Sequence, residues 1–240
     1  MYRDDETPAS AWVLGGTSGI GLCVAEMLRR KHIPTFIDGA DTFDVRQPLS
    51  AFRQKLEDYG FPVYVVYAAG INYLEFLGAG EDSDDHHLDV IDVNLKGFIK
   101  LVDAMAYYAN DYETSPDAPS IVAISSDAAE RPLRTSIGYC SSKAGLNQAV
   151  KVAARELGVY NWKVNAVAPG MTDGTNMTAY VDEAVPRVRK WSHEAARHYE
   201  RVQEVTPGRI APIDVAQVVV QTLLGPTHLN GCITTINGGR

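Results

Sequence analysis

The feature that most constrains the fold is a glycine-rich turn between an apolar run and a helical segment. Residues 11–14 are apolar, the sequence Gly-Gly-Thr-Ser-Gly-Ile-Gly follows at 15–21, and residues 22–28 carry apolar side chains at helical spacing. Glycine is needed where the backbone takes a positive φ or lies close to a diphosphate, and the start of a helix offers N–H donors and a positive dipole end. A strand, a glycine turn and a helix in this order predict a nucleotide-binding site, and the alternative is a simple tight turn.

An acidic residue ends the next predicted strand. The strand covers residues 34–37, and Asp38 follows it, seventeen residues after Gly21, near the place where an acidic side chain would bind an adenosine ribose. Asp38 would repel a 2′-phosphate, and neither Ser18 nor Gly39 supplies a basic side chain to hold one. These residues favour NAD over NADP. The alternative is that Asp38 is a solvated turn residue.

The segment after Asp38 is short. Five residues separate Asp38 from Asp44, whereas the crossover between parallel strands needs about 10 to 12 residues. Residues 43–45 are therefore expected to form a very short third strand at most. Helical spacing follows over residues 48–59, and the continuous apolar run at 62–67 is typical of a parallel strand buried on both faces.

The small residues Ala68, Ala69 and Gly70 follow that run. Their size would let the backbone lie against the adenine side of a dinucleotide. A plain turn after a strand would have the same composition, so this stretch is consistent with a nucleotide site without establishing one.

Tyr139 and Lys143 form the most informative chemical pair in the sequence. They are four residues apart in a segment with helical spacing that runs to Leu157, so both side chains should project from one helix face. A free phenol titrates near ~10, and a neighbouring ammonium together with a cationic cofactor ring favours the phenolate. We therefore expect the pKa of Tyr139 to be lowered by roughly three units, which suits proton transfer near neutral pH.

Two further polar residues are expected near this pair. Ser126 lies thirteen residues before Tyr139, at the end of the apolar run 121–124, where a strand would deliver its hydroxyl to a substrate oxygen. Asn94 lies in a segment with helical spacing at 90–108 and is flanked by apolar residues. A buried asparagine needs hydrogen-bond partners, so Asn94 is either a structural bridge or part of a water-mediated proton path.

The last third of the chain predicts a strand, a long polar segment and a closing helix and strand. The strand at 162–168 is followed by Pro-Gly, and residues 171–206 are polar and irregular in character. Their length and polarity favour a partly helical substrate lid over the active site, and the alternative is a surface insertion. Helical spacing returns at 213–224, and residues 233–236 predict a final strand.

Composition excludes several classes of partner. The 240 residues are 45% apolar and 22% charged, enough for one large α/β domain. A net charge of −8 without a basic run argues against nucleic acid or an anionic membrane as a partner. No apolar run approaches the roughly 18 residues of a membrane span and the first residues are acidic, so we expect a cytoplasmic protein. Three widely spaced cysteines suit neither a disulfide framework nor a zinc site, and no metal is expected.

Together these residues make the chain resemble the short-chain dehydrogenase/reductase family along nearly its whole length. The glycine turn, Asn94, Ser126 and the Tyr139-x-x-x-Lys143 pair occur in the family's order and at its spacings, as do the Pro-Gly step and the closing Ile-Asn-Gly-Gly. The resemblance implies a single-domain Rossmann fold over residues 1–240, with a doubly wound parallel sheet of about seven strands.

The resemblance also implies a role for each of the four catalytic candidates. Tyr139 would be the general acid/base, and Ser126 would orient the substrate oxygen. Lys143 would hold the nicotinamide ribose and lower the Tyr139 pKa, while Asn94 would fix a water that continues the proton relay. Family members are commonly tetramers built on two long helices, so we expect a homo-oligomer, either a dimer or a tetramer.

The cofactor-binding residues expected from the motifs and the resemblance extend over most of the chain. The threonine that would meet the nicotinamide carboxamide is Thr175 or Thr172. The full set is Gly15, Thr17, Ser18, Gly19, Ile20, Gly21, Asp38, Asp44, Val45, Ala68, Ala69, Gly70, Asn94, Tyr139, Lys143, Pro169, Gly170, Thr172 and Thr175.

Three functions are compatible with the sequence. The first is an oxidoreductase that transfers a hydride between NAD(H) and a secondary alcohol or carbonyl compound. Residues 125–129 are also similar to dihydrodiol dehydrogenases that act on cyclic dihydroxy acids, so a cyclic diol or a hydroxy acid is one candidate substrate. The second function is an NADPH-dependent carbonyl reductase. The third is a non-catalytic nucleotide-sensing relative, which the presence of Tyr139 and Lys143 disfavours.

Overall fold

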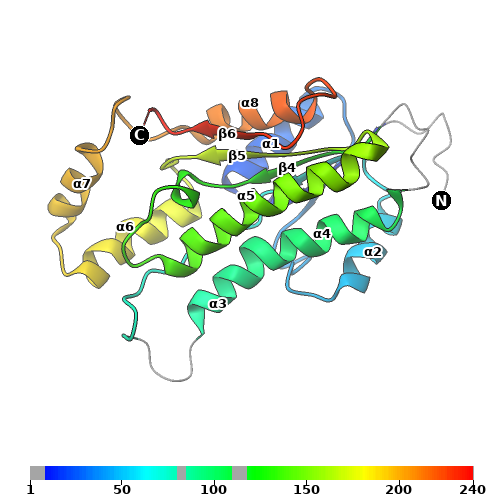
Figure 1. Ribbon diagram of the computed structural model, residues 1–240. Coiled ribbons are helices and arrows are strands. Elements are labelled where there is room, and N and C mark those ends of the chain that lie inside the picture. The colour runs from blue at the N-terminus through cyan, green and yellow to red at the C-terminus, as the bar shows by residue number, and fades with distance from the viewer. Residues whose placement is uncertain (1–8, 80–84, 110–117, 240) are drawn as a thin grey trace.

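The computed structural model describes residues 9–79, 85–109 and 118–239, which form a central sheet between two layers of helices (Figure 1). Within these residues the sheet has six parallel strands in the order β2-β1-β3-β4-β5-β6. The expected α/β, Rossmann-like fold is confirmed. The strands are β1 (Ala11–Leu14), β2 (Thr35–Asp38), β3 (Tyr64–Tyr67), β4 (Ser120–Ile124), β5 (Lys163–Pro169) and β6 (Ile233–Ile236).

Helices cover both faces of this sheet. Helices α1 and α8 pack on one face, and α2, α4 and α5 pack on the other (Figure 1). Side chains of β1 alternate between the two cores: Trp12 and Leu14 join the α2, α4 and α5 side, whereas Ala11 and Val13 join the α1 and α8 side. The bounds are α1 (Gly19–Arg30), α2 (Leu49–Asp58), α4 (Gly97–Ala106), α5 (Ile137–Leu157) and α8 (Pro212–Leu223).

Burial on both faces explains the continuous apolar runs in the sequence. Residues of a strand point alternately to opposite faces, so a strand covered on both sides needs apolar side chains at every position. All four residues of β1 and all five of β4 are buried. The lack of alternation in these runs is therefore a consequence of the double helical cover.

The order in which the chain adds strands to the sheet reverses next to the glycine turn. The chain moves from β1 to the edge strand β2 and then returns past β1 to form β3 on its other side. In open parallel sheets the ligand site lies beyond the carboxyl ends of the strands at such a reversal. Here the reversal lies between β1 and β3, where residues 15–21 and 68–70 follow their strands.

The very short strand considered at residues 43–45, which would have been the third along the chain and would have brought the sheet to seven strands, is not formed. These residues make a loop in which Phe43 and Val45 are buried against the core. Phe43 contacts Phe52 of α2 and Trp12 of β1, with ring centroids 4.8 and 5.8 Å apart. The connection from β2 is too short for a crossover helix, so the loop buries its apolar side chains under α2 and leaves β2 at the sheet edge.

The helical segment expected at 90–108 contains a change of pitch. Helix α3 (His86–Ile91) continues into a π-helical turn, η1 (Asp92–Lys96), and then into α4. A π turn inserts an extra residue into the helix and frequently marks a functional position. Asn94 lies inside it and is fully buried.

The region expected to form a lid contains two helices. They are α6 (Asn176–Arg189) and α7 (His193–Arg201), and they lie beyond the carboxyl ends of the strands, at the left of Figure 1. None of the α7 residues is buried, so this helix adds no apolar core of its own.

The part of the chain that the structure describes contains neither a membrane-spanning helix nor a group of side chains suited to a metal ion. No helix in residues 9–79, 85–109 or 118–239 is long and apolar enough to cross a membrane. Within these ranges, no three His, Cys, Asp or Glu side chains are grouped so that they could hold a metal ion.

Candidate active site

The glycine turn is packed against the end of β3. Gly15 has a φ of +79°, and a Cβ atom there would lie 2.5 Å from the backbone nitrogen of Ala69. A Cβ at Gly21 would lie 2.2 Å from the carbonyl oxygen of Gly15. Both positions therefore require glycine, and the turn brings the start of α1 close to the strand end. No side chain caps α1 at Ser18, which leaves the first backbone N–H groups of the helix available to an anion.

Tyr139 and Lys143 lie on one face of α5, as the spacing predicts. Both side chains are buried, and the Lys143 Nζ lies 5.7 Å from the centre of the Tyr139 ring. The ammonium donates a hydrogen bond of 2.8 Å to the carbonyl oxygen of Ile124, the last residue of β4. Ser126 follows two residues later and its hydroxyl is a hydrogen-bond partner of the phenol. The ends of β4 and α5 thus bring Ser126, Tyr139 and Lys143 together.

In the protein alone the pKa of Tyr139 shifts upward, whereas the predicted lowering, which includes the cationic ring of a bound cofactor, stays a prediction. Burial raises the pKa of the phenol to about 12, which the Ser126 hydrogen bond opposes and the Asp127 charge increases. Burial also lowers the pKa of Lys143 to about 8. Desolvation penalises the charged form of each group, and it is the largest cause of both shifts.

Asn94 forms a bridge between the loop after β3 and the start of α5. Its Oδ1 accepts from the Ile71 backbone N–H at 2.8 Å, while its Nδ2 donates to the Ile71 carbonyl at 2.9 Å and to Ser142 Oγ at 3.0 Å. Ser142 in turn donates to the Tyr139 carbonyl at 2.8 Å. The amide therefore has the structural role that was one of two alternatives, and the water-mediated proton path stays a prediction.

Asp38 is held inside the protein by residues that the sequence did not reveal. The side chain is 3% exposed, and its carboxylate accepts hydrogen bonds from Trp12 Nε1 at 3.0 Å, Tyr59 Oη at 2.9 Å and Lys55 Nζ at 3.2 Å. Burial alone would raise the pKa of the Asp38 carboxyl, but these bonds and a hydrogen bond from Thr42 outweigh burial and lower the pKa below its usual value. Asp38 is therefore ionised. The sequence places no cation at Ser18 or Gly39, but packing of α2 against β2 brings Lys55 to the Asp38 carboxylate from elsewhere in the chain.

A cavity of about 520 Å³ joins the glycine turn to the Tyr139 face of α5. Most of the predicted site residues line it, whereas Thr17, Asp38, Asp44, Val45, Ala69 and Asn94 lie outside its lining. Val45 is buried in the core and Asp44 pairs with Arg46 at 2.8 Å. The predicted residues that line the cavity are Gly15, Ser18, Gly19, Ile20, Gly21, Ala68, Gly70, Ser126, Tyr139, Lys143, Pro169, Gly170, Thr172 and Thr175.

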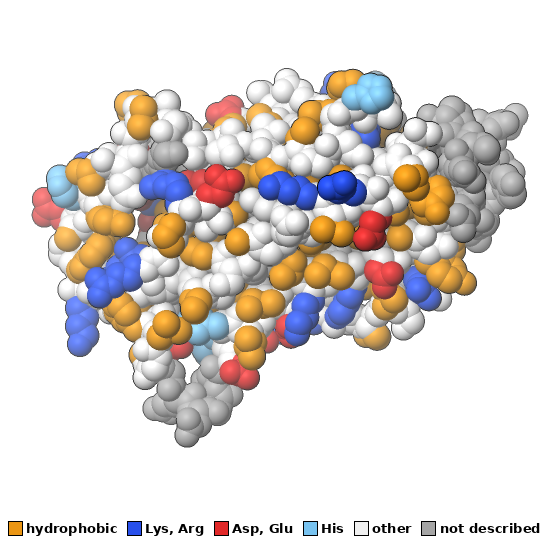
Figure 2. Space-filling model, in the orientation of Figure 1, with side chains coloured by type: hydrophobic (Ala, Val, Ile, Leu, Met, Phe, Trp, Pro, Cys, Tyr) orange, Lys and Arg blue, Asp and Glu red, His pale blue; other side chains and the backbone are white. Residues whose placement is uncertain are grey.

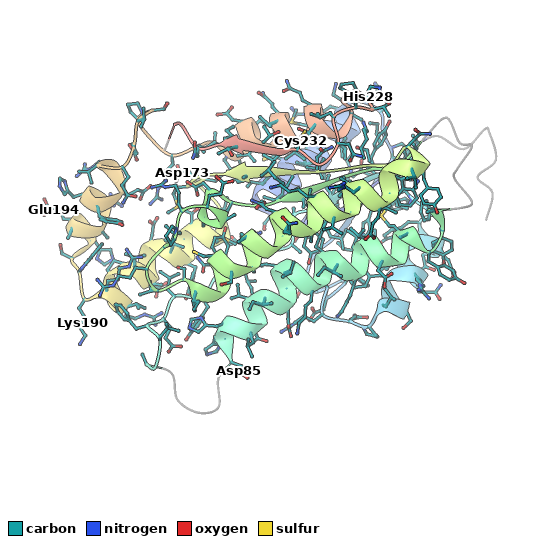
Figure 3. All side chains as sticks on the ribbon, in the orientation of Figure 1. Asp85, Asp173, Lys190, Glu194, His228 and Cys232 are labelled. Carbon is teal, nitrogen blue, oxygen red and sulfur yellow. The ribbon has the colours of Figure 1, made fainter. Side chains whose placement is uncertain are left out.

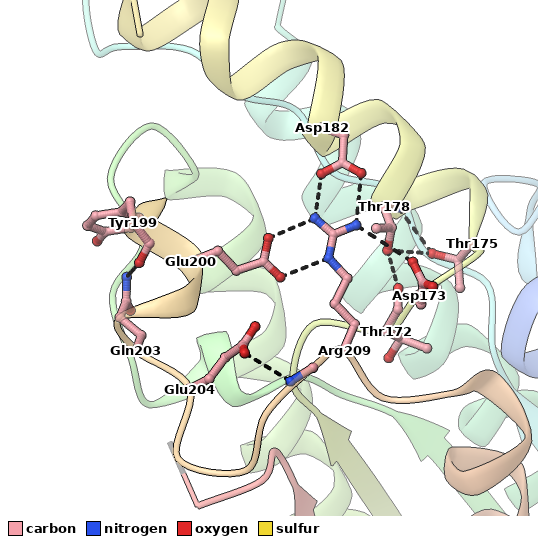
Figure 4. A network of polar contacts seen from close by, with 11 residues as sticks. Thr172, Asp173, Thr175, Thr178, Asp182, Tyr199, Glu200, Gln203, Glu204 and Arg209 are labelled. Atoms are coloured by element: carbon pink, nitrogen blue, oxygen red, sulfur yellow. Dashed lines mark hydrogen bonds and ion pairs between the residues drawn. The ribbon is translucent and has the colours of Figure 1, made fainter. Parts of the chain in front are cut away.

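Helices α6 and α7 close one wall of this cavity and are held by a partly buried ion-pair network that the sequence did not suggest. Arg209, in the loop before α8, binds both Asp182 of α6 and Glu200 of α7 (Figure 4). The guanidinium nitrogens lie 2.6 to 2.8 Å from the carboxylate oxygens of these two residues. Lys190 and Glu194 mark the outer end of the helix pair, away from the sheet (Figure 3).

The comparison with protein families decides the relationship of this chain. A model of the short chain dehydrogenases matches residues 40–186, more than half of the sequence. The match contains Asn94, Ser126, Tyr139 and Lys143. The chain belongs to the short-chain dehydrogenase family. It is therefore an oxidoreductase that acts on alcohol or carbonyl groups, in a family whose general cofactors are NAD and NADP.

Characterised relatives of this short-chain dehydrogenase include several reductases. Acetoacetyl-CoA reductase of Synechocystis is 32% identical over 187 residues, which cover 72% of this chain and 75% of the relative. The 3-oxoacyl-[acyl-carrier-protein] reductase of Pseudomonas aeruginosa is 30% identical over 221 residues, covering 90% and 81%. A variant of actinorhodin polyketide ketoreductase, solved with NADPH, superposes with a TM-score of 0.84 at 26% identity, covering 100% of this chain and 98% of that structure.

The described residues of this short-chain dehydrogenase fit a dinucleotide. The uncapped start of α1 and the glycines at 15, 19 and 21 suit the diphosphate. Glycine is required in this turn because a Cβ at Gly15 or Gly21 would collide with the protein backbone. At the other end, a Cβ at Gly70 would lie 3.4 Å from Asn94 Oδ1 and 3.5 Å from Lys143 Nζ. Gly70 thus leaves space for a ribose beside the ammonium.

The lowered pKa of Lys143 predicts a pH-dependent difference in stability between the wild type and Lys143→Met. A lysine pKa of about 8 in the folded state, below its value of 10.5 in the unfolded chain, means that the unfolded chain binds the proton more tightly. Between pH 8 and 10.5, the free energy of unfolding of the wild type should therefore rise relative to Lys143→Met, by about 1 to 3 kcal/mol.

Urea unfolding of the cofactor-free proteins at pH 7.0 and pH 9.5 measures this difference. Lys151→Met, an exposed lysine on the same helix, serves as the control and should show no such change. A Lys143→Met difference that stays constant with pH would contradict the desolvated state of Lys143.

Proposed function

We propose that this protein transfers a hydride between a nicotinamide cofactor and a secondary alcohol or carbonyl compound, with Tyr139 as the proton carrier. The observation that carries the proposal is that Ser126, Tyr139 and Lys143 meet in the same cavity that contains the glycine turn. The names of the reductase relatives support the same reaction class.

Each of the three residues has a separate task in this proposal. Tyr139 gives a proton to, or takes one from, the substrate oxygen at its phenol, and Ser126 hydrogen-bonds that oxygen. Lys143 places a cation beside the phenol and beside the space at Gly70. The nicotinamide ring supplies or accepts the hydride when the cofactor is bound.

A protonated Tyr139 phenol suits carbonyl reduction at neutral pH. Burial keeps the phenol protonated, which is the form needed to donate a proton to a developing alkoxide. Oxidation of an alcohol needs the phenolate, so a further positive charge close to the phenol must first lower its pKa.

We also propose that residues 1–240 act as one nucleotide-binding domain and that residues 171–206 form the substrate lid. Met177, Val181 and Val185 of α6 line the cavity together with Ala196 and Tyr199 of α7. The lid therefore contributes apolar and polar side chains to the same space as Tyr139. The third candidate, a non-catalytic nucleotide sensor, would not need this combination of lid and proton carrier.

For the cofactor we propose a preference for NAD. The residues that face the adenosine end of the glycine turn, 17–18 and 39–42, contain no Lys or Arg and include the exposed Asp41. A 2′-phosphate would meet a like charge there. Asp38 contributes less to this preference than its position suggested, since Lys55 compensates its charge.

The alternative, an NADPH-dependent carbonyl reductase, is favoured by two specific observations. Lys55 lies 3.2 Å from Asp38 and removes most of the charge that would repel a 2′-phosphate. The actinorhodin ketoreductase, which covers nearly the whole chain, was solved with NADPH. The two candidates differ only in the cofactor and the favoured direction.

We further propose a homo-oligomer built on α4 and α5. Apolar side chains are spread over the face of the molecule that these helices form (Figure 2). Ile99 of α4 is 48% exposed and Val152 of α5 is 44% exposed. Covering them in a second subunit would remove apolar surface from water.

Tyr139→Phe is expected to reduce kcat at least about 100-fold, because the phenol carries the proton. Binding of NAD should be nearly unchanged, since the cofactor is held mainly by the glycine turn and Lys143. Steady-state kinetics and a separate cofactor titration measure both effects, with the exposed Tyr107→Phe as the control. Retention of a tenth or more of wild-type kcat would refute the role of Tyr139.

The cofactor proposal predicts a kcat/KM for NAD(H) at least about tenfold above that for NADP(H), which corresponds to about 1.4 kcal/mol. Ala40→Arg should shift this ratio towards NADP by about tenfold or more, because Ala40 is exposed beside the turn. Ala40→Gln is the neutral control. Arginine at Gly39 is a poorer test, since a Cβ there would lie 2.5 Å from Thr17 Oγ1. Equal or better kcat/KM with NADP in the wild type would favour the reductase alternative.

The oligomer proposal predicts a solution mass of at least twice the chain mass of 26.2 kDa. Light scattering at micromolar concentration measures it, and Ile99→Asp together with Val152→Asp should lower the mass by placing charges in the contact. A monomeric wild type would rule out the proposal.

A further inference from the structure

The lid wall of the cavity carries an unusual number of charged side chains. Three are acidic and three are arginines, and they come from the segment after β4 and from α6 and α7. They are Asp127, Arg131, Asp182, Arg189, Arg197 and Glu200. The distribution of this charge bears on the class of substrate.

Each of the three carboxylates already has an arginine partner within the protein. Asp182 and Glu200 both bind Arg209 (Figure 4), which is not one of the residues that line the cavity. Asp127 binds Arg131 at 3.2 Å. These acids therefore offer little free negative charge to a cationic substrate.

Arg131 is also committed. Its Nη1 donates to Asp127, and its Nη2 donates to Gln203 Oε1 at 2.9 Å. Arg197 is exposed and lies close enough to Asp182 to lower the pKa of that carboxyl. Both arginines thus face an acidic group of the cavity wall.

Arg189 differs from the other arginines because it has no carboxylate partner among residues 9–79, 85–109 and 118–239. Its Nη2 donates to the Arg134 carbonyl oxygen at 2.6 Å, and its guanidinium carbon lies 5.2 Å from the centre of the Trp191 ring. The Nε–H is buried and has no acceptor within the described residues. A guanidinium with five donors is therefore held in place by neutral groups and keeps its charge uncompensated.

We propose that the substrate carries an anionic group, a carboxylate or a phosphate, and that Arg189 binds this group while the carbonyl lies at Ser126 and Tyr139. The inference rests on the proposed function, because it assigns a substrate class to the same cavity. Planar oxyanions match the fork of a guanidinium, and charge-assisted hydrogen bonds are about twice as strong as neutral ones. Contact with Trp191 and with the Arg134 carbonyl fixes the guanidinium before the anion arrives.

Two pairs of matched ketones test the proposal. The first pair is 4-oxocyclohexanecarboxylate and its methyl ester, and the second is dihydroxyacetone phosphate and dihydroxyacetone. Within each pair the charge is the main difference, and the pairs separate carboxylate from phosphate. Calorimetric titration in the presence of NAD⁺ measures binding without turnover, because a ketone cannot be reduced by the oxidised cofactor.

In at least one pair, the wild type should bind the anionic ketone at least tenfold more tightly than the neutral one, and high salt should reduce the preference. Arg189→Met should reduce it below threefold, and Arg189→Lys should keep part of it. Arg187→Met is the matched control, since Arg187 is an exposed arginine of the same helix outside the cavity lining. It should leave the preference unchanged.

Three results would overturn the proposal. They are equal affinity of the wild type for both members of each pair, an anion preference that survives in Arg189→Met, and an equal loss of affinity for the neutral ketone in that variant. The last result would show that Arg189 only holds the lid. Turnover of a neutral ketone without any charge preference would leave the proposed function intact, whereas an Arg189-dependent preference without turnover with NADH or NADPH would contradict the proposed function alone.

Discussion

The hydrogen bond from Lys143 to the carbonyl oxygen of Ile124 is the interaction on which the site depends. It attaches the face of α5 that carries Tyr139 to the carboxyl end of β4, so Tyr139 and Ser126 meet although thirteen residues separate them. Burying an ammonium is costly unless hydrogen bonds compensate it, and here part of that cost remains as the lowered pKa of Lys143. The same burial raises the pKa of Tyr139, so the position of the catalytic pair and its protonation have one cause.

The two halves of the cavity are stabilised in different ways. The cofactor half consists of strand ends and a glycine turn set on two apolar cores, where a Cβ at Gly15 would already collide with Ala69. The lid half consists of α6 and α7, tied to the domain by the ion pairs of Arg209. Apolar packing fixes the backbone around the glycine turn, whereas polar contacts between helices hold the wall formed by α6 and α7.

Much of the fold could be predicted because its signals are local. The strand, turn and helix at residues 11–30, and the pairing of Tyr139 with Lys143, depend on neighbours within one element. The very short strand considered at residues 43–45 is absent, because the five residues between Asp38 and Asp44 do not supply the crossover length that a parallel strand requires. The role of Asn94 was left between two alternatives until its contacts with Ile71 and Ser142 were known.

The sequence by itself determined the element order, the glycine turn and the placement of Tyr139 and Lys143 on one helix face, because periodicity and glycine chemistry act over a few residues. Only the tertiary structure decided the charge state of the site. Lys55 compensates Asp38 from seventeen residues away, and Arg209 binds two acids on different helices, while Arg189 has no carboxylate partner among the described residues. Electrostatic energy depends on distance and burial in space, and neither can be obtained from spacing along the chain.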